Sequence, residues 1–252
     1  MKNPFDLTGK KSIVTGCRTG IGQGIAISLA QAGADIISFD RNEPKETGAA
    51  IESLGRRFSW IRIDLLAASA EELQNAVDDV EAVHPVDILV NNAGICPRAP
   101  IPKHPAKMWE DTIKLNLSAV WYLAQAASRH MITRKSGKII ITGSALTFQG
   151  GLNVPGYAAS KHGVAGIAKS MANSLAEHHV NVNVIAPGYI RTKLTQAIQN
   201  DAERNKSILE RIPAKRWGTP EDIGGTCVFL ASSAADYIHG TVICVDGGWM
   251  GR

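Results

Sequence analysis

IVTGCRTGIGQG, residues 13–24, is the stretch that decides how this chain folds. An apolar run leads into it and a segment of helical period follows it. Its spacing, Thr15-Gly16-x-x-x-Gly20-x-Gly22, differs from the dinucleotide fingerprint G-x-G-x-x-G, so the surroundings have to decide its meaning. We expect Gly16 to end a strand and Gly20 and Gly22 to begin a helix, where free backbone N–H groups and the helix dipole suit a pyrophosphate. For an isolated glycine cluster, a tight turn with nothing bound is an equally good interpretation.

Asp40 favours the nucleotide interpretation. It stands at the end of the second expected strand, 18 residues beyond Gly22, where dinucleotide-binding folds carry a carboxylate for the ribose hydroxyls. A carboxylate there repels a 2′-phosphate, so we predict NAD as the cofactor. Arg18 and Arg41 are the kind of neighbours through which such folds accept NADP, and that alternative stays open. Without the glycine loop, a solvated turn residue would be the better interpretation of Asp40.

Length and composition limit the classes of protein to consider. The chain has 252 residues, 44% apolar and 20% charged, with a net charge of +4, which predicts one large domain of globular composition over residues 1–252. No apolar run approaches the roughly 18 residues that cross a bilayer, and residues 1–6 lack the layout of a signal peptide. We therefore expect a cytoplasmic protein without membrane contact. Cationic side chains form no basic run, which argues against nucleic acid and is compatible with an anionic small substrate.

The cysteines predict neither a disulfide framework nor a metal site. They are widely scattered and form no C-x-x-C pair, so free thiols are the expected state. The four are Cys17, Cys96, Cys227 and Cys244.

Short β-branched runs alternate along the chain with longer segments of helical period. The expected strands are residues 11–15, 35–39, 58–63, 87–91, 138–142, 180–185 and 241–245. The expected helices are residues 22–32, 70–83, 106–131, 156–178 and 220–231. This alternation predicts an α/β fold with a doubly wound, parallel, seven-stranded sheet and helices on both faces. The irregular region at about 187–206 is expected to form a lid over a site at the strand ends.

Polar motifs follow the fourth and fifth expected strands, at the edge where a doubly wound fold binds its ligand. Asn91-Asn92-Ala93-Gly94 follows the fourth, and Ser144 follows the fifth. Tyr157 lies thirteen residues after Ser144, and Lys161 follows it at the i+4 position of an expected helix, so the two share one face. A nearby ammonium group favours the phenolate and makes the tyrosine a usable acid–base catalyst. A lone Y-x-x-x-K pair occurs by chance on helices, but the combination makes chance improbable.

Together, T-G-x-x-x-G-x-G, N-N-A-G, Ser144, Y-x-x-x-K and N-V-I-A-P-G at residues 183–188 resemble the short-chain dehydrogenase/reductase family. The resemblance covers essentially the whole chain. It implies a single Rossmann-type domain, usually in a homotetramer, and an enzyme that moves hydride between a nicotinamide cofactor and an alcohol or ketone.

The resemblance also implies residue roles. Tyr157 is the catalytic acid–base, Ser144 holds the substrate oxygen, and Lys161 lowers the pKa of the tyrosine and binds the nicotinamide ribose. Asn116 matches the asparagine that supports a proton relay through water, although a buried helix asparagine bonded to backbone is the alternative on spacing alone. The cofactor-binding set is Gly16, Arg18, Thr19, Gly20, Ile21, Gly22, Asp40, Asp64, Leu65, Asn91, Ala93, Gly94, Tyr157, Lys161, Pro187, Gly188, Ile190 and Thr192.

Residues 148–151, 186–189, 211–218 and 245–249 are similar to a branch of the family that acts on sugar acids. The implied substrate is of the 2-deoxy-D-gluconate or 2-dehydro-3-deoxy-D-gluconate type. We expect it to meet Ser144 and Tyr157, with Arg98 for its carboxylate and Gln149 for a hydroxyl. A solvated arginine and a turn glutamine bonded to backbone are the alternatives for the last two. Trp217 and Trp249 are expected to pack the lid and a subunit interface rather than substrate.

Two competing functions stay open. One is the same chemistry on another substrate, as in gluconate 5-dehydrogenase, 3-oxoacyl-carrier-protein reductase or a polyol dehydrogenase, which share the catalytic motifs. The other is a non-catalytic NAD-binding regulator on the same fold. Regulators of that kind commonly lack the tyrosine or the lysine, and this chain has both.

Overall fold

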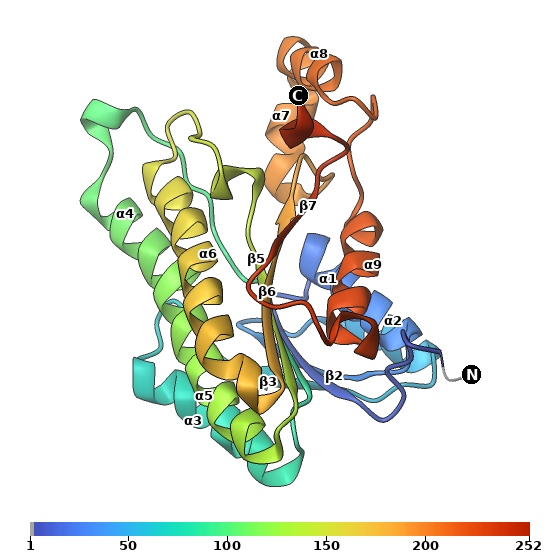
Figure 1. Ribbon diagram of the computed structural model, residues 1–252. Coiled ribbons are helices and arrows are strands. Elements are labelled where there is room, and N and C mark those ends of the chain that lie inside the picture. Colours follow the sequence, from blue (N-terminus) through green and yellow to red (C-terminus); the bar gives the residue numbers. More distant parts are fainter. Residues whose placement is uncertain (1–2) are drawn as a thin grey trace.

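Seven parallel strands form one sheet in the order β3-β2-β1-β4-β5-β6-β7 in the computed structural model, which describes residues 3–252 (Figure 1). Met1 and Lys2 lie outside the described residues. They belong to the domain predicted over residues 1–252 and to the N-terminal segment in which no signal peptide is expected. The strands are β1 (Lys11–Thr15), β2 (Asp35–Asp40), β3 (Phe58–Arg62), β4 (Ile88–Asn91), β5 (Gly137–Thr142), β6 (Val180–Pro187) and β7 (Val242–Val245). The predicted doubly wound α/β fold is confirmed.

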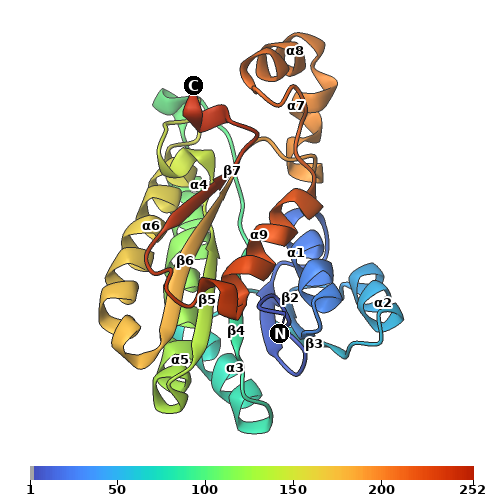
Figure 2. The same cartoon turned by 45° about the vertical axis from the view of Figure 1, so that its right-hand side comes forward.

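Helices cover both faces of this sheet, and Figure 2 shows the two layers apart. One face carries α1 (Gly20–Gln31), α2 (Lys45–Ser53) and α9 (Pro220–Ala231). The other face carries α3 (Ala70–Val83), α5 (Ala119–Arg134) and α6 (Pro155–Leu175), with α4 (Ala106–Ile113) packed on α6. Each layer encloses its own buried apolar cluster against the sheet. The strands β1, β4 and β5 are almost fully buried and lack the polar alternation of a half-exposed sheet, whereas the edge strand β3 is largely exposed.

Two helical predictions differ from the structure. The expected helix 106–131 is interrupted, because a π-helical turn at Lys114–Ser118 separates α4 from α5. The helix α2 was not predicted, because its sequence KETGAAIES combines a glycine with strongly polar residues and buries only Thr47, Gly48 and Ile51. A π-turn of this kind leaves backbone groups outside the regular i to i−4 pattern and is frequent at functional sites.

The segment between β6 and α9 rises above the strand ends as the predicted lid region (Figure 2). It is more regular than expected, because it holds η5 (Lys193–Thr195), α7 (Gln196–Asn200) and α8 (Ala202–Arg211). Its two ends meet in a parallel β-bridge between Ile190 and Gly218, so the segment extends past the predicted limit at residue 206.

A third apolar cluster lies under this segment and holds it to the C-terminal residues. Trp217 and Trp249 are buried there, and Tyr189 packs edge-on against both, with ring centres 5.3 and 4.7 Å away. The guanidinium of Arg211, at the end of α8, lies 3.8 Å from the centre of the Trp249 ring. The two tryptophans therefore pack the base of the lid segment, as predicted for that part of their role.

Candidate active site

A cleft of about 450 Å³ lies at the carboxyl ends of β1 and β4. The chain runs outward from β1 to β2 and β3, and then returns to place β4 on the other side of β1. This reversal separates the loops above the sheet and opens a crevice where doubly wound folds bind ligands. The predicted site residues that line it are Gly16, Thr19, Gly20, Ile21, Gly22, Asp40, Asp64, Leu65, Ala93, Gly94, Ser144, Tyr157, Lys161, Pro187, Gly188, Ile190 and Thr192.

The glycine loop forms a cradle that side chains would fill. Gly16 and Gly20 have φ of +68° and +64°, in the left-handed region that favours glycine. A Cβ at Gly22 would overlap the Gly16 carbonyl oxygen and the side-chain amide of Asn92. The helix α1 begins at Gly20 and points its N-terminus into this space. The cradle therefore fits the pyrophosphate of a dinucleotide.

Asp40 lines the other end of the cleft, and hydrogen bonds from neighbouring residues hold its carboxylate. Its Oδ2 accepts a 2.7 Å hydrogen bond from the Ser38 hydroxyl and a 2.9 Å bond from the Cys17 backbone N–H. Burial raises the pKa of Asp40 above its ordinary value, against the lowering effect of these bonds and of the Arg18 charge. Arg41 also lines the cleft, and its guanidinium lies 3.8 Å from the carboxylate of Asp64.

Tyr157, Ser144 and Lys161 meet where β5 ends. The ammonium nitrogen of Lys161 donates a 2.6 Å hydrogen bond to the Thr142 carbonyl and lies 5.5 Å from the centre of the Tyr157 ring. The Ser144 hydroxyl accepts a 3.1 Å bond from the backbone N–H of Leu146, which orients it at the start of a short 3₁₀ turn.

The pKa values of this pair differ in part from the expectation. Burial raises the pKa of Tyr157 to about 12, because desolvation outweighs the lowering effect of the Ser144 hydrogen bond and of the Arg98 charge. Burial also lowers the pKa of Lys161 to about 8. The predicted lowering of the phenol's pKa by the neighbouring ammonium is not seen, because desolvation dominates and the charge that lowers this pKa belongs to Arg98.

Two predicted asparagines turn their side chains away from the cleft. Asn116 lies in the π-turn, and its amide brackets Ile95, with Oδ1 accepting from the Ile95 N–H at 2.9 Å and Nδ2 donating to the Ile95 carbonyl at 2.8 Å. Asn91 is buried and donates to the Val120 carbonyl at 3.3 Å. Asn92 lines the cleft instead, and its amide donates to the Thr15 and Gly16 carbonyls. The Asn116 side chain thus holds the loop after β4 through hydrogen bonds to the Ile95 backbone. This is the buried, backbone-bonded asparagine that was the alternative on spacing alone.

The remaining predicted residues, Arg18, Arg98 and Gln149, are not part of the cleft lining. Gln149 accepts a 2.9 Å bond from the indole N–H of Trp249, so it contacts the C-terminal segment. Arg98 is exposed and donates to the Leu152 carbonyl at 3.3 Å, while its charge still acts on Tyr157.

Other lining residues were not predicted. Some adjoin predicted motifs, and the three from η5 belong to the region predicted only as a lid, whereas nothing in the sequence marks Leu115. They are Phe39, Arg41, Ile63, Leu66, Asn92, Ile95, Leu115, Thr142, Gly143, Lys193, Leu194 and Thr195.

The described residues hold no group of three or more His, Cys, Asp or Glu side chains in reach of one metal ion. Among the same residues no helix has both the length and the apolarity to span a membrane.

A doubly wound sheet with a phosphate cradle at its switch point and a tyrosine–lysine pair one strand away defines a Rossmann-type nicotinamide-dependent oxidoreductase. The family described as enoyl-(acyl carrier protein) reductase, adh_short_C2, matches residues 16–250. The chain belongs to the short-chain dehydrogenase/reductase family, as the sequence motifs predicted.

Named relatives match over nearly their whole length. The 2-dehydro-3-deoxy-D-gluconate 5-dehydrogenase of Escherichia coli K12 is 49% identical over 98% of each chain. The enzyme of the same name from Bacillus subtilis is 47% identical over 100% of this chain and 99% of its own. A structure from Agrobacterium tumefaciens, described as a 2-deoxy-D-gluconate 3-dehydrogenase with bound NADP, superposes with a TM-score of 0.94 at 47% identity, over 100% of both chains.

Proposed function

We propose that this chain transfers hydride between a nicotinamide cofactor and a secondary alcohol or ketone of a sugar acid, of the 2-dehydro-3-deoxy-D-gluconate or 2-deoxy-D-gluconate type. The observation that carries the proposal is the meeting of Tyr157, Ser144 and Lys161 in a cleft that begins at the glycine cradle. The names of relatives at 47–49% identity support the sugar-acid class.

The chain's own residues supply proton transfer and alignment. When bound, the nicotinamide accepts or supplies the hydride. In the oxidation direction, Tyr157 takes the proton of the substrate hydroxyl, and Ser144 donates a hydrogen bond to the oxygen on which charge changes. Lys161 stays close to the phenol ring and offsets the cost of forming phenolate in a buried position, in which the pKa of Tyr157 is raised. The cradle at Gly16, Gly20 and Gly22 would hold the pyrophosphate of the cofactor in the same cleft that Tyr157 and Ser144 line.

Arg98 is proposed to bind the carboxylate of the substrate. Its guanidinium uses one nitrogen for the Leu152 carbonyl and lies close enough to Tyr157 to lower the pKa of that phenol. The other guanidinium nitrogens can form the paired bonds that suit a carboxylate. Gln149 is proposed to reach a sugar hydroxyl, which requires it to exchange its bond with Trp249.

NAD is proposed as the preferred cofactor. Asp40 presents a carboxylate at the end of β2, and a carboxylate at the adenosine ribose favours two free hydroxyls over a 2′-phosphate. NADP is the second candidate, because Arg41 lines the same end of the cleft and the similar Agrobacterium tumefaciens structure is described with bound NADP. A 3-oxoacyl thioester is the second candidate substrate, since Leu115 and Leu194 add apolar surface to the cleft.

The assembly is proposed to be a cytoplasmic homotetramer that takes part in sugar-acid metabolism, without nucleic-acid or membrane partners. The strand β7 supports self-association, because it lies at the edge of the sheet with Cys244 exposed, and Tyr237 before it is 99% exposed. Light scattering coupled to gel filtration tests this directly, and a mass near 27 kDa would contradict it.

The test of the function is the initial rate of nicotinamide absorbance change with purified protein. NAD(H) and NADP(H) are each combined with 2-dehydro-3-deoxy-D-gluconate, 2-deoxy-D-gluconate, gluconate and a 3-oxoacyl thioester. We expect the largest kcat/KM for a deoxy or keto sugar acid with NAD(H). Activity confined to the thioester with NADPH would contradict both parts of the proposal. Nicotinamide binding without turnover on any substrate would favour the regulator.

A further inference from the structure

The carboxylate of Asp40 is held by two donors that share one oxygen. The Ser38 hydroxyl and the Cys17 backbone N–H both bind Oδ2, at 2.7 and 2.9 Å. Because both donors bind Oδ2, Oδ1 is the oxygen left for a ligand in the cleft. The direction of the carboxylate therefore depends on what fixes these two donors.

The backbone donor is fixed independently of Ser38. The Cys17 carbonyl accepts a 2.8 Å bond from the Thr47 hydroxyl, which in turn accepts a 3.0 Å bond from the Gln23 amide. On the neighbouring strand β3, the indole N–H of Trp60 donates to the Asp40 carbonyl at 2.9 Å. The chain is thus held on both sides of the carboxylate, and Ser38 is the side chain that completes the arrangement.

The Ser38 hydroxyl faces the Asp40 carboxylate and the Cys17 thiol. Ser38 lies on β2 with no exposed surface, two residues before Asp40 on the same side of the strand. The other buried residues of β2 are apolar, namely Ile36, Ile37 and Phe39. A buried hydroxyl that donates to a carboxylate forms a charge-assisted bond, which is short and strong because the acceptor is ionised.

We propose that Ser38 is a positioning residue that directs the Asp40 carboxylate toward the adenosine ribose and thereby sets the discrimination between NAD and NADP. This inference rests on the proposed NAD preference. Ser38 touches neither cofactor nor substrate and acts through Asp40.

The electrostatics agree with this geometry. Burial raises the pKa of Asp40, and the bond from Ser38 is the largest of the effects that lower it again. The other charged or titratable groups near the carboxylate are Arg18 and the Cys17 thiol from the glycine loop, together with Arg41 and its partner Asp64. As pH falls through the pKa of Asp40, the acid becomes neutral and stops repelling a 2′-phosphate. Loss of the Ser38 hydroxyl moves this change to higher pH.

The test is the ratio of dissociation constants, Kd for NADP over Kd for NAD, measured by calorimetry without substrate between about pH 5 and 8. We expect Ser38→Ala to lower the ratio about tenfold at neutral pH and to shift its decline upward in pH. Ser38→Cys, a weaker donor of similar size, should give an intermediate ratio. The 2′-phosphate itself titrates near pH 6 in every sample, so the readout is the difference between each variant and the wild type.

Ser12→Ala is the matched control. Ser12 is also fully buried, on the adjacent strand β1, and within residues 3–252 its hydroxyl has no hydrogen-bond partner. It should keep the wild-type ratio at every pH. Asp40→Asn is the positive control and should lose the discrimination. If Asp40→Asn loses it while Ser38→Ala retains it, the role of Ser38 is overturned and the NAD proposal stands. If Asp40→Asn also retains it, both are overturned.

Discussion

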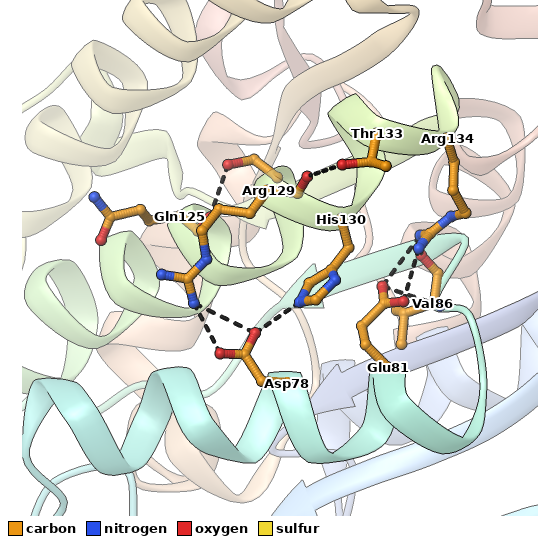
Figure 3. A network of polar contacts seen from close by, with 9 residues as sticks. Asp78, Glu81, Val86, Gln125, Arg129, His130, Thr133 and Arg134 are labelled. Atoms are coloured by element: carbon orange, nitrogen blue, oxygen red, sulfur yellow. Dashed lines mark hydrogen bonds and ion pairs between the residues drawn. The ribbon is translucent and has the colours of Figure 1, made fainter.

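Two polar clusters on the α3, α5 and α6 side of the sheet differ in whether their charged side chains have an opposite charge beside them. Between α3 and α5, every charge meets an opposite one (Figure 3): Arg134 binds Glu81 through both nitrogens at 2.7 and 3.1 Å, and Arg129 binds Asp78 at 2.9 Å. At the head of α6, Lys161 is only 5% exposed and forms none of the ion pairs found among residues 3–252. Its partner there is a backbone carbonyl.

This difference distinguishes charged side chains that stabilise the fold from charged side chains that serve the reaction. The ion pairs of the first cluster join α3 to α5, so these charges add stability. The unpaired cluster has pKa values moved in opposite directions by burial, upward for Tyr157 and downward for Lys161. A buried group without a counter-ion destabilises the fold and is retained where a reaction needs it. Substitutions in the two clusters should therefore have opposite signatures in activity and stability.

Tyr157→Phe should produce the largest effect. Removal of the hydroxyl takes away the proton donor and acceptor, so kcat should fall about 10³-fold, within the range for general acid–base catalysis. Cofactor binding should change little, because the phenyl ring remains in place. Steady-state rates with the preferred substrate and calorimetric Kd for NAD measure the two. Turnover within tenfold of the wild type would remove Tyr157 from the mechanism.

Glu81→Gln should damage stability and leave the reaction unaffected. The Glu81 side chain is 3% exposed and accepts from Arg134 and from the Val86 N–H, so the change weakens three bonds and leaves a half-buried cation unpaired. We expect a loss of about 2 kcal/mol in the free energy of unfolding, measured by urea denaturation. Arg129→Ala is the control, because that arginine is half exposed and surface pairs contribute less than about 1 kcal/mol. Equal losses in the two variants would show that burial does not distinguish the pairs.

Lys161→Met should reverse this pattern, with lower activity and higher stability. Burial lowers the pKa of Lys161 from 10.5 to about 8, so below pH 8 the folded protein holds a charge that the unfolded chain solvates better. Part of the gain is offset by losing the bond to the Thr142 carbonyl, and we expect a net gain of about 1 kcal/mol at pH 7 without cofactor.

The pH dependence of stability tests the direction of the pKa shift at Lys161. Between about pH 8 and 10.5 the unfolded chain binds more protons at this position than the folded protein, so wild-type stability rises with pH relative to the variant. The advantage of Lys161→Met in thermal unfolding should therefore shrink from pH 7 to pH 9.5. An advantage that grows over this interval would contradict the assigned direction of the pKa shift.

The sequence predicted the fold and most of the cleft because both depend on local patterns. Strands β1 to β7 are short apolar runs, and Gly16, Gly20 and Gly22 are needed wherever backbone must approach a phosphate. The tyrosine and lysine share a helix face through i, i+4 spacing alone. The interruption of the helix at Lys114–Ser118 could not be seen, because a π-turn keeps the apolar period on both sides.

Side-chain direction was the part that local pattern could not supply. Gln149 is five residues from Ser144 in sequence, yet it bonds to Trp249, one hundred residues away. Asn91 and Asn92 are adjacent in one motif, and the pleat sends the first into the core and the second into the cleft. The lid segment looked irregular because α7 and α8 are short and polar, and their buried residues Ile198 and Ile208 pack in a cluster with residues distant in sequence, such as Trp249.

Asp78→Asn should have the smallest effect and also tests how the paired cluster responds to acid. Burial raises the pKa of Asp78, but His130 at 2.7 Å and Arg129 outweigh this and hold it below the ordinary value of 3.8. The carboxylate therefore adds stability above pH 4, which is lost as pH falls through its lowered pKa. We expect a loss of less than about 1 kcal/mol at pH 7, unchanged at pH 5 and smaller below pH 4, from thermal unfolding at each pH. A difference that already changes between pH 7 and 5 would contradict the lowered pKa of Asp78.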